Sequence, residues 1–173
     1  RERRKNAGKP YDKPNLVMSA AYQVVWEKFC QLWQIEMRTV PITREHPTLN
    51  IEEALEMCDE NTICIVPIAG VTWTGMNDDI EALNDVLDEY NRITGFDIPI
   101  HVDAASGGFI LPFLDPHKKW DFRLKWVLSI STSGHKYGLV YPGLGWIVWK
   151  DRKYLPDEMS FSVNYLGASI TQV

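Results

Sequence analysis

The segment TICIVPI, residues 62–68, decides the fold class of this chain. It is rich in β-branched residues and apolar on both faces, which is typical of a strand buried between two layers of helices. Such strands belong to parallel sheets, because the crossover connections of parallel strands place helices on both faces. The segment therefore predicts an inner strand of an α/β fold.

Helical and extended patterns alternate before this segment. Residues 14–19 (PNLVMS) have the pattern of a buried strand, and residues 36–42 (EMRTVPI) alternate like a strand. Between them, apolar residues recur at helical spacing at Tyr22, Val25, Trp26, Phe29 and Trp33. Asn50, with Glu53 three residues later, predicts the N-cap of a short helix.

The alternation continues after the segment. Asp78 and Glu81 are expected to open a helix whose apolar side carries Ile80, Leu83, Leu87 and Tyr90. Further strands are predicted at residues 98–103, 126–131 and 144–149. The chain is thus expected to form one α/β layered domain with a largely parallel sheet. Nearly all of the tryptophans, among them Trp26, Trp33, Trp146 and Trp149, are interpreted as core packing.

Composition excludes several classes of protein. The chain has 173 residues, 45% of them hydrophobic, so a disordered or low-complexity protein is excluded. A net charge of −5 argues against a nucleic-acid partner, and no apolar run is long enough to cross a bilayer. Three scattered cysteines favour reduced thiols and a cytoplasmic location. Because it begins at Arg1 and stops within a strand-like segment, the chain is expected to be a piece of a longer protein.

Polar residues follow three of the predicted strands. Thr72 and Thr74 follow the strand predicted at residues 62–68, and Asp103 ends the strand predicted at 98–103. At the end of the strand predicted at 126–131 stand Ser131, Ser133, His135 and Lys136. In open α/β sheets, ligands bind beyond the carboxyl ends of the strands. We therefore expect these side chains to share one site.

Lys136 and Asp103 carry the chemistry of this expected site. A loop lysine is usually only an exposed side chain, but a partly desolvated amine beside a strand end can form a Schiff base. Asp103 has an equally plain alternative, the capping of a turn, whereas a carboxylate paired with a pyridinium nitrogen is what pyridoxal 5'-phosphate (PLP) requires. His101 and Asp103 suggest a metal pair, but no third ligand has convincing spacing, so no metal site is assigned.

Several motifs together resemble one enzyme family. HVDAASGGF (101–109), SGHKYG (133–138), DENTICIVPIAGVTWTG (59–75) and YPGLGWIVW (141–149) resemble the PLP-dependent amino-acid decarboxylases, and within them the bacterial glutamate decarboxylases. The resemblance implies the large domain of a type I PLP-dependent transferase-like fold, a mostly parallel mixed sheet flanked by helices. It covers residues 1–173 as one incomplete PLP-binding domain that lacks an N-terminal segment and a C-terminal small domain.

Site residues are carried over from the resemblance by position. It implies that Lys136 forms the Schiff base, that Asp103 pairs with the pyridinium nitrogen, and that Ala105 and Gln23 stack against the ring. Thr72, Ser133 and His135 match further cofactor contacts, and His135 is also assigned to catalysis. These assignments, with Lys136 and Asp103 as the other catalytic residues, complete the predicted site.

The resemblance implies decarboxylation of L-glutamate to γ-aminobutyrate (GABA), a reaction that consumes a proton and therefore suits acid resistance. It also implies that the enzyme is cytoplasmic and forms a homodimer or a larger homo-oligomer. Two alternatives stay open: a PLP-dependent decarboxylase of another amino acid, such as an aromatic one, and a non-catalytic fragment that serves folding or assembly. The segments expected to bind the substrate's carboxylates lie outside these residues, so the fragment alone is expected to be inactive.

Overall fold

The computed structural model describes residues 2–155, 157–159, 161–165 and 168–172. Its main feature is a six-stranded sheet in the order β2-β1-β3-β4-β5-β6. The strands are β1 (Asn15–Ser19), β2 (Glu36–Val40), β3 (Thr62–Val66), β4 (Ile100–Asp103), β5 (Val127–Ser133) and β6 (Gly145–Trp149). β1 to β5 pair in parallel and β6 joins β5 antiparallel, which confirms the mostly parallel mixed sheet predicted from the sequence.

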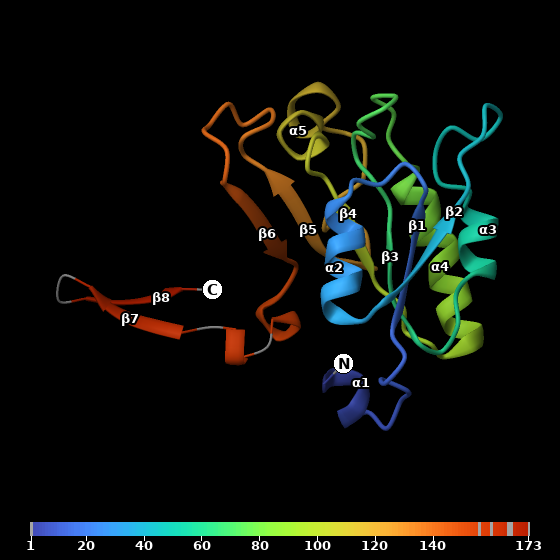
Figure 1. Ribbon diagram of the computed structural model, residues 1–173, viewed down its shortest axis with the longest axis horizontal. Coiled ribbons are helices and arrows are strands. Elements are labelled where there is room, and N and C mark those ends of the chain that lie inside the picture. Colours follow the sequence, from blue (N-terminus) through green and yellow to red (C-terminus); the bar gives the residue numbers. More distant parts are fainter. Residues whose placement is uncertain (1, 156, 160, 166–167, 173) are drawn as a thin grey trace.

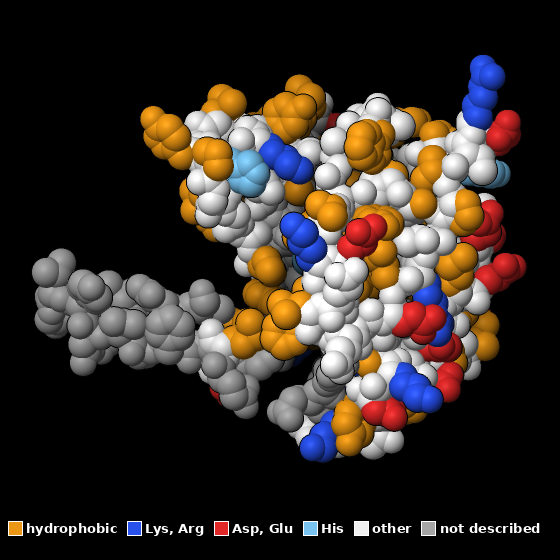
Figure 2. Space-filling view, in the orientation of Figure 1, with side chains coloured by type: hydrophobic (Ala, Val, Ile, Leu, Met, Phe, Trp, Pro, Cys, Tyr) orange, Lys and Arg blue, Asp and Glu red, His pale blue; other side chains and the backbone are white. Residues whose placement is uncertain are grey.

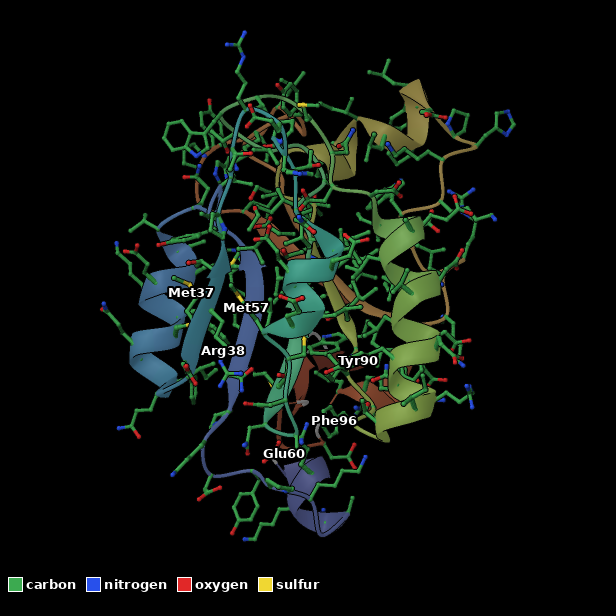
Figure 3. The ribbon with its side chains drawn as sticks, turned by 90° about the vertical axis from the view of Figure 1, so that its right-hand side faces the viewer. Met37, Arg38, Met57, Glu60, Tyr90 and Phe96 are labelled. Carbon is green, nitrogen blue, oxygen red and sulfur yellow. The ribbon has the colours of Figure 1, made fainter. Side chains whose placement is uncertain are left out.

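Helices cover both faces of the sheet (Figures 1 and 3). α2 (Val25–Trp33) lies on one face, and α3 (Ile51–Glu56) and α4 (Ile80–Thr94) lie on the other. The remaining elements are α1 (Glu2–Asn6), η1 (Gly107–Phe109), α5 (Leu111–Leu114), η2 (Arg152–Tyr154), η3 (Asp157–Met159) and the antiparallel pair β7 (Phe161–Tyr165) and β8 (Ala168–Gln172). Within the described residues, no helix is long and apolar enough to traverse a lipid bilayer.

Two hydrophobic clusters fill the space between the layers. Alternation along the strands divides the side chains between the two faces, so Val17 and Ile65 face α3 and α4 while Leu16 and Met18 face α2. All four are completely buried. The segment at residues 62–68 therefore provides an inner strand, as its two-sided hydrophobicity predicted.

Capping side chains fix where the helices begin. Asn50 caps α3 by accepting hydrogen bonds from the backbone N–H groups of Glu52 and Glu53, as expected. The prediction that Asp78 opens α4 is wrong, because Asp79 is the N-cap and accepts from Ala82 N. Asp78 is buried instead, and its two carboxylate oxygens accept from the backbone N–H groups of Leu49 and Ile68.

Arg38 ties the edge strand β2 to the segment after α3. Its Nη1 lies 2.8 Å from Asp59 Oδ2 and donates a 2.7 Å hydrogen bond to the carbonyl of Met57 (Figure 3). Because the guanidinium is held by both a charged and a neutral acceptor, it fixes the turn that leads into β3.

Several apolar side chains expected in the core are at the surface. On α2, Val25 and Trp33 are 59% and 58% exposed, and Trp146 on β6 is 41% exposed. Core packing is therefore the wrong interpretation for Trp33 and Trp146. In Figure 2, hydrophobic side chains also gather at the surface over β5, β6 and the loop between them, where Leu139 and Tyr141 are among the most exposed.

Candidate active site

The strand order places the carboxyl ends of four strands at one edge of the sheet. The chain runs from β1 outward to β2 and returns to β3 on the other side of β1, so a topological switch point lies between β1 and β3. The segments after these strands carry most of the predicted site residues: Gln23 after β1, Thr72 after β3, Asp103 and Ala105 at the end of β4, and Ser133, His135 and Lys136 at the end of β5.

Asp103 is the buried acid of this edge, with 6% of its surface exposed. Its backbone is joined to the segment that follows β3, because Asp103 N donates to Pro67 O and Ala69 N donates to Asp103 O. Its side-chain Oδ1 accepts from Ala105 N at 3.1 Å, which is the turn-capping contact that the sequence left open. Its Oδ2 accepts from Trp26 Nε1 at 2.7 Å.

Lys136 lies in a tight turn directly after β5, at a partly buried position. Lys136 N donates to Ser133 O, and Ser133 N donates to Ala105 O, so the lysine turn is connected to the segment that follows Asp103. Close packing explains the glycines of the turn. A Cβ on Gly134 would lie 2.6 Å from the Trp146 ring, and one on Gly138 would lie 2.5 Å from Gly134 O.

Thr72, Gln23 and His135 lie on the segments at the same edge, and in the described part of the chain none of them is hydrogen-bonded to the Asp103 side chain. Thr72 and His135 are exposed, and Gln23 is partly buried in the segment just before α2. His135 Nδ1 lies 3.3 Å from Leu144 O. Within the described residues, the hydrogen bonds of Asp103's side chain go to Trp26 and Ala105, and none joins it to Thr72 or Lys136. The structure therefore gathers the predicted residues on four neighbouring strand ends.

His101 occupies the face of β4 that also carries Asp103, two residues before it. Its Nδ1 lies 2.7 Å from Ser129 Oγ and its Nε2 lies 3.2 Å from Ser131 Oγ. Burial lowers the pKa of His101 to about 4, so the ring is neutral at physiological pH. Ser131, which was expected to share the candidate site, thus has its hydroxyl against this histidine. In the described ranges, no cluster of three or more His, Cys, Asp or Glu side chains is arranged to hold a metal ion.

Sequence reasoning missed the contact between Trp26 and Asp103. The helical spacing of residues 22–33 assigned Trp26 to an apolar face, and nothing in that pattern distinguishes an indole that packs from one that also donates a hydrogen bond. Trp26 does pack with the cluster beneath α2, but its N–H reaches across to the end of β4. The available signal was the residue type, because a buried indole N–H usually finds an acceptor.

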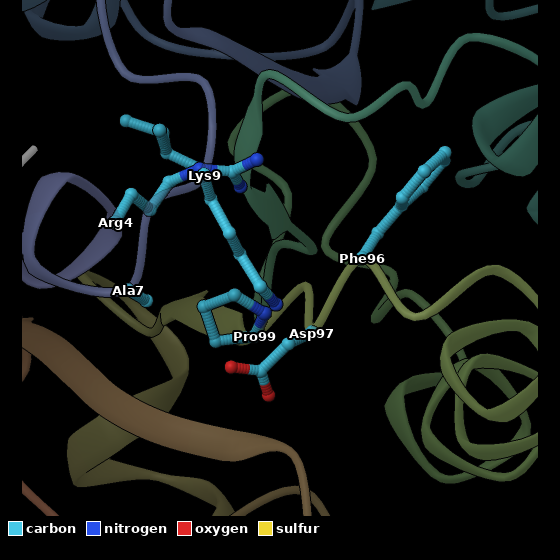
Figure 4. A pocket seen from close by; sticks show the side chains of 7 residues that line it. Arg4, Ala7, Lys9, Phe96, Asp97 and Pro99 are labelled. Atoms are coloured by element: carbon cyan, nitrogen blue, oxygen red, sulfur yellow. The ribbon is translucent and has the colours of Figure 1, made fainter.

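A cavity of about 170 Å³ lies at the opposite edge of the sheet, near the amino ends of β3 and β4 (Figure 4). Its cations already have partners, since Arg4 Nη1 donates to Thr62 O and Lys9 Nζ donates to Gly95 O. Figure 4 shows the Lys9 side chain running across it toward Pro99. This cavity is therefore separate from the site around Asp103. Its lining is Arg4, Ala7, Lys9, Ile63, Phe96, Asp97 and Pro99.

The groups around Asp103 fit PLP. Both hydrogen bonds to the Asp103 carboxylate come from uncharged N–H groups, and no lysine or arginine of the described residues pairs with it. A buried carboxylate is costly unless a cation accompanies it, and a protonated pyridine nitrogen is such a cation. The neighbouring strand leads to Lys136, and a lysine amine is a group that can form a Schiff base with an aldehyde.

Comparisons with known proteins agree with this chemistry. The family model described as the pyridoxal-dependent decarboxylase conserved domain matches residues 1–173. A glutamate decarboxylase of Lactococcus lactis subsp. cremoris is 58% identical over 158 residues, which cover 91% of this chain and 34% of that protein. Glutamate decarboxylase beta of Listeria monocytogenes is 60% identical over the same shares of the two chains.

A solved structure is also similar. The glutamate decarboxylase of Lactobacillus brevis superimposes with a TM-score of 0.91 at 52% identity, covering 99% of this chain and 39% of that one. The chain thus spans about a third of the length of the curated relatives it matches. The family that the motifs predicted is confirmed. The chain belongs to the pyridoxal-dependent decarboxylase family, whose cofactor is pyridoxal 5'-phosphate.

Proposed function

We propose that this chain is the cofactor-binding part of an enzyme that decarboxylates L-glutamate to GABA. The observation that carries the proposal is the buried Asp103 carboxylate, which accepts hydrogen bonds from two uncharged donors at the end of β4. The next strand of the sheet, β5, leads to Lys136. The substrate is proposed from the similarity to glutamate decarboxylases of Lactococcus and Listeria. Since the chain spans about a third of these relatives, residues 1–173 are proposed as one incomplete large domain.

The residues of the four strand ends are assigned roles around the cofactor. Lys136 Nζ would bind its aldehyde carbon, and Asp103 would pair with its ring nitrogen and hold a proton on that atom. Ala105 and Gln23 are assigned to stacking against the ring. Thr72, Ser133 and His135 are assigned to its polar substituents, in keeping with their position on the segments that follow β3 and β5.

The reaction follows from what each group can supply. When bound, PLP supplies an electron sink for the pair left by the bond to the departing carboxylate. The α-carboxylate leaves as carbon dioxide and a proton is added at Cα, so each turnover consumes one proton. His135 is assigned to this proton delivery because its imidazole is exposed beside Lys136. Removal of protons suits a role in acid resistance.

We further propose that the enzyme acts in the cytoplasm as a homodimer or larger homo-oligomer. Support for self-association comes from the apolar side chains exposed around β6, because monomers rarely expose large apolar patches. Sedimentation of the full-length protein tests this part of the proposal. A monomer at micromolar concentration would contradict it.

The test of the cofactor site is covalent labelling of the full-length protein. We expect PLP to produce a visible absorption band, and borohydride to attach the cofactor to Lys136, as read by peptide mass spectrometry. Lys136→Ala should abolish the label, whereas Lys119→Ala should retain it, because Lys119 forms a surface ion pair with Glu81. A folded protein without the band, or with the label elsewhere, would contradict the proposal and favour a non-catalytic role in folding or assembly.

The substrate is tested by carbon dioxide release from a panel of amino acids with PLP added. We expect L-glutamate to be the preferred substrate, and GABA and carbon dioxide to form in equal amounts. Preference for an aromatic amino acid would refute the substrate while leaving the cofactor site in place. Both tests use aliquots of one preparation, and borohydride is added only to the aliquot that is labelled, because reduction of the Schiff base ends turnover.

A further inference from the structure

The orientation of the Asp103 carboxylate is fixed from two sides. Oδ1 accepts from Ala105 N, two residues along the same segment. Oδ2 accepts from Trp26 Nε1 at 2.7 Å, and Trp26 belongs to α2, a different element on the face of the sheet. Two donors on two oxygens prevent the carboxylate from rotating about its Cβ–Cγ bond. The local donor alone would hold the carboxylate less firmly, because only one of its two oxygens would then be hydrogen-bonded within the described residues.

Trp26 is itself held in place by neighbouring rings. Its indole packs edge-on against the imidazole of His101, with ring centroids 5.5 Å apart, and against Phe29 at 5.9 Å. His101 cannot rotate freely, because its two nitrogens face the hydroxyls of Ser129 and Ser131 on β5. The indole N–H is therefore directed at Asp103 by packing that continues into two strands of the sheet.

His101 also keeps the surroundings of the carboxylate free of a competing cation. Its ring is neutral, so the donors around Asp103 in the described part of the chain are uncharged. A hydrogen bond donated to a carboxylate stabilises the anion over the protonated acid, and such bonds are stronger than those between neutral groups. An acid held as an anion leaves a shared proton on the partner nitrogen.

We propose that Trp26 is a positioning residue of the enzyme: its indole N–H orients the Asp103 carboxylate and donates to it, so that the proton shared with the cofactor's ring nitrogen stays on the ring. This inference rests on the proposed function, because it takes PLP as the partner of Asp103. It gives Trp26 a role beyond its ring contact with Phe29 on the same helix.

The test replaces the indole by a ring of similar packing that has no donor. Trp26→Phe in the full-length protein keeps an aromatic ring against His101 and removes the hydrogen bond to Asp103. The matched control is Trp126→Phe, because Trp126 Nε1 also donates to a carboxylate, that of Asp88, on the other face of the sheet. Both variants thus lose one indole–carboxylate bond, and only one of these carboxylates is in the proposed site.

Two measurements distinguish positioning from packing. The first is the ¹⁵N resonance of PLP labelled at its ring nitrogen, which reports directly whether that atom carries the proton. We expect Trp26→Phe to move it toward the unprotonated value and Trp126→Phe to leave it unchanged. The second is the dissociation constant of PLP from the apo-protein, which we expect to rise about tenfold in Trp26→Phe, the effect of one charge-assisted hydrogen bond. In an Asp103→Asn background, Trp26→Phe should add less than about threefold, because the charge that the indole stabilises is gone.

Unchanged ring-nitrogen resonance and unchanged affinity in Trp26→Phe, in a protein whose Lys136 is still labelled, would overturn the role of Trp26 alone. Failure of Lys136 to bind PLP at all would instead overturn the proposed function. If Trp26→Phe does not fold, the indole N–H resonance of Trp26 is compared between the wild type and Asp103→Asn. A resonance that does not move between these two proteins overturns the proposal, and an upfield move in Asp103→Asn supports it.

Discussion

Replacing Asp78 with alanine is expected to leave two buried backbone N–H groups without an acceptor. Asp78 is 1% exposed, and its Oδ1 and Oδ2 accept from Leu49 N at 2.8 Å and from Ile68 N at 2.6 Å. This carboxylate therefore joins the loop before α3 to the end of the central strand. Ile68 pairs with Asp103 across the sheet, so the connection supports the backbone on which the candidate site is built.

The magnitude follows from the cost of an unsatisfied donor. A buried N–H that loses its partner costs about 1–3 kcal/mol, and 1.4 kcal/mol is a tenfold change in an equilibrium constant. We therefore expect the amides of Leu49 and Ile68 to exchange with solvent about 5 to 150 times faster in Asp78→Ala than in the wild type. Hydrogen exchange read by mass spectrometry on peptides that cover these two residues measures the effect in the intact protein.

Asp79→Ala provides the matched control, because Asp79 is the neighbouring acid but caps α4 through Ala82 N. It should speed exchange in the first turn of α4 and leave Leu49 and Ile68 at their wild-type rates. The reasoning is refuted if Asp78→Ala leaves both amides protected as in the wild type, or if the control exposes them equally.

Three further predictions concern the sheet, helix α4 and the lysine turn. Burial lowers the pKa of His101 to about 4 in the folded protein, against about 6.5 in the unfolded chain, so the unfolded chain takes up a proton first as the pH falls. The free energy of unfolding should therefore decrease by about 3 kcal/mol in total between pH 6.5 and pH 4. His101→Asn should flatten this part of a plot of unfolding free energy against pH. Leu87→Ala should lower the free energy of unfolding in urea by about 2–5 kcal/mol, because Leu87 is completely buried. Val86→Ala, at a 46% exposed position of the same helix, should lower it by less than about 1 kcal/mol. Equal losses of stability would contradict this assignment of the helix faces. Gly134→Ala should reduce the attachment of PLP to Lys136 by borohydride, because the new methyl group would lie 2.6 Å from the Trp146 ring and would displace the turn. A variant labelled as fully as the wild type would show that the turn can shift without cost.

The predictable part of this protein depends on local signals. Two-sided hydrophobicity marked β3 as an inner strand, and a side-chain oxygen at Asn50 with Glu53 beyond it marked the start of α3. Asp103 and Lys136 were proposed as site residues because Asp103 ends one strand and Lys136 follows the next, and the ends of parallel strands meet at one edge. Each of these signals is complete within a few residues of sequence.

Other features needed the packed chain. Spacing could not show that Val25 and Trp33 remain at the surface of α2, because a helix face is buried only where another layer covers it. The helix signal at residues 78–81 did not show that Asp79 caps α4 while Asp78 turns inward to two distant amides.

The sequence by itself determined the alternation of strands and helices along the chain and the family, and it nominated Asp103 and Lys136 as the acid and the amine of the candidate site. Only the tertiary structure decided what surrounds the acid: an indole 77 residues earlier in the chain donates to Asp103, beside a histidine kept neutral by burial. The physical reason is that a hydrogen bond between distant segments depends on how layers dock and which side chains lose water. These properties arise from the whole packing, and no periodicity within one segment encodes them.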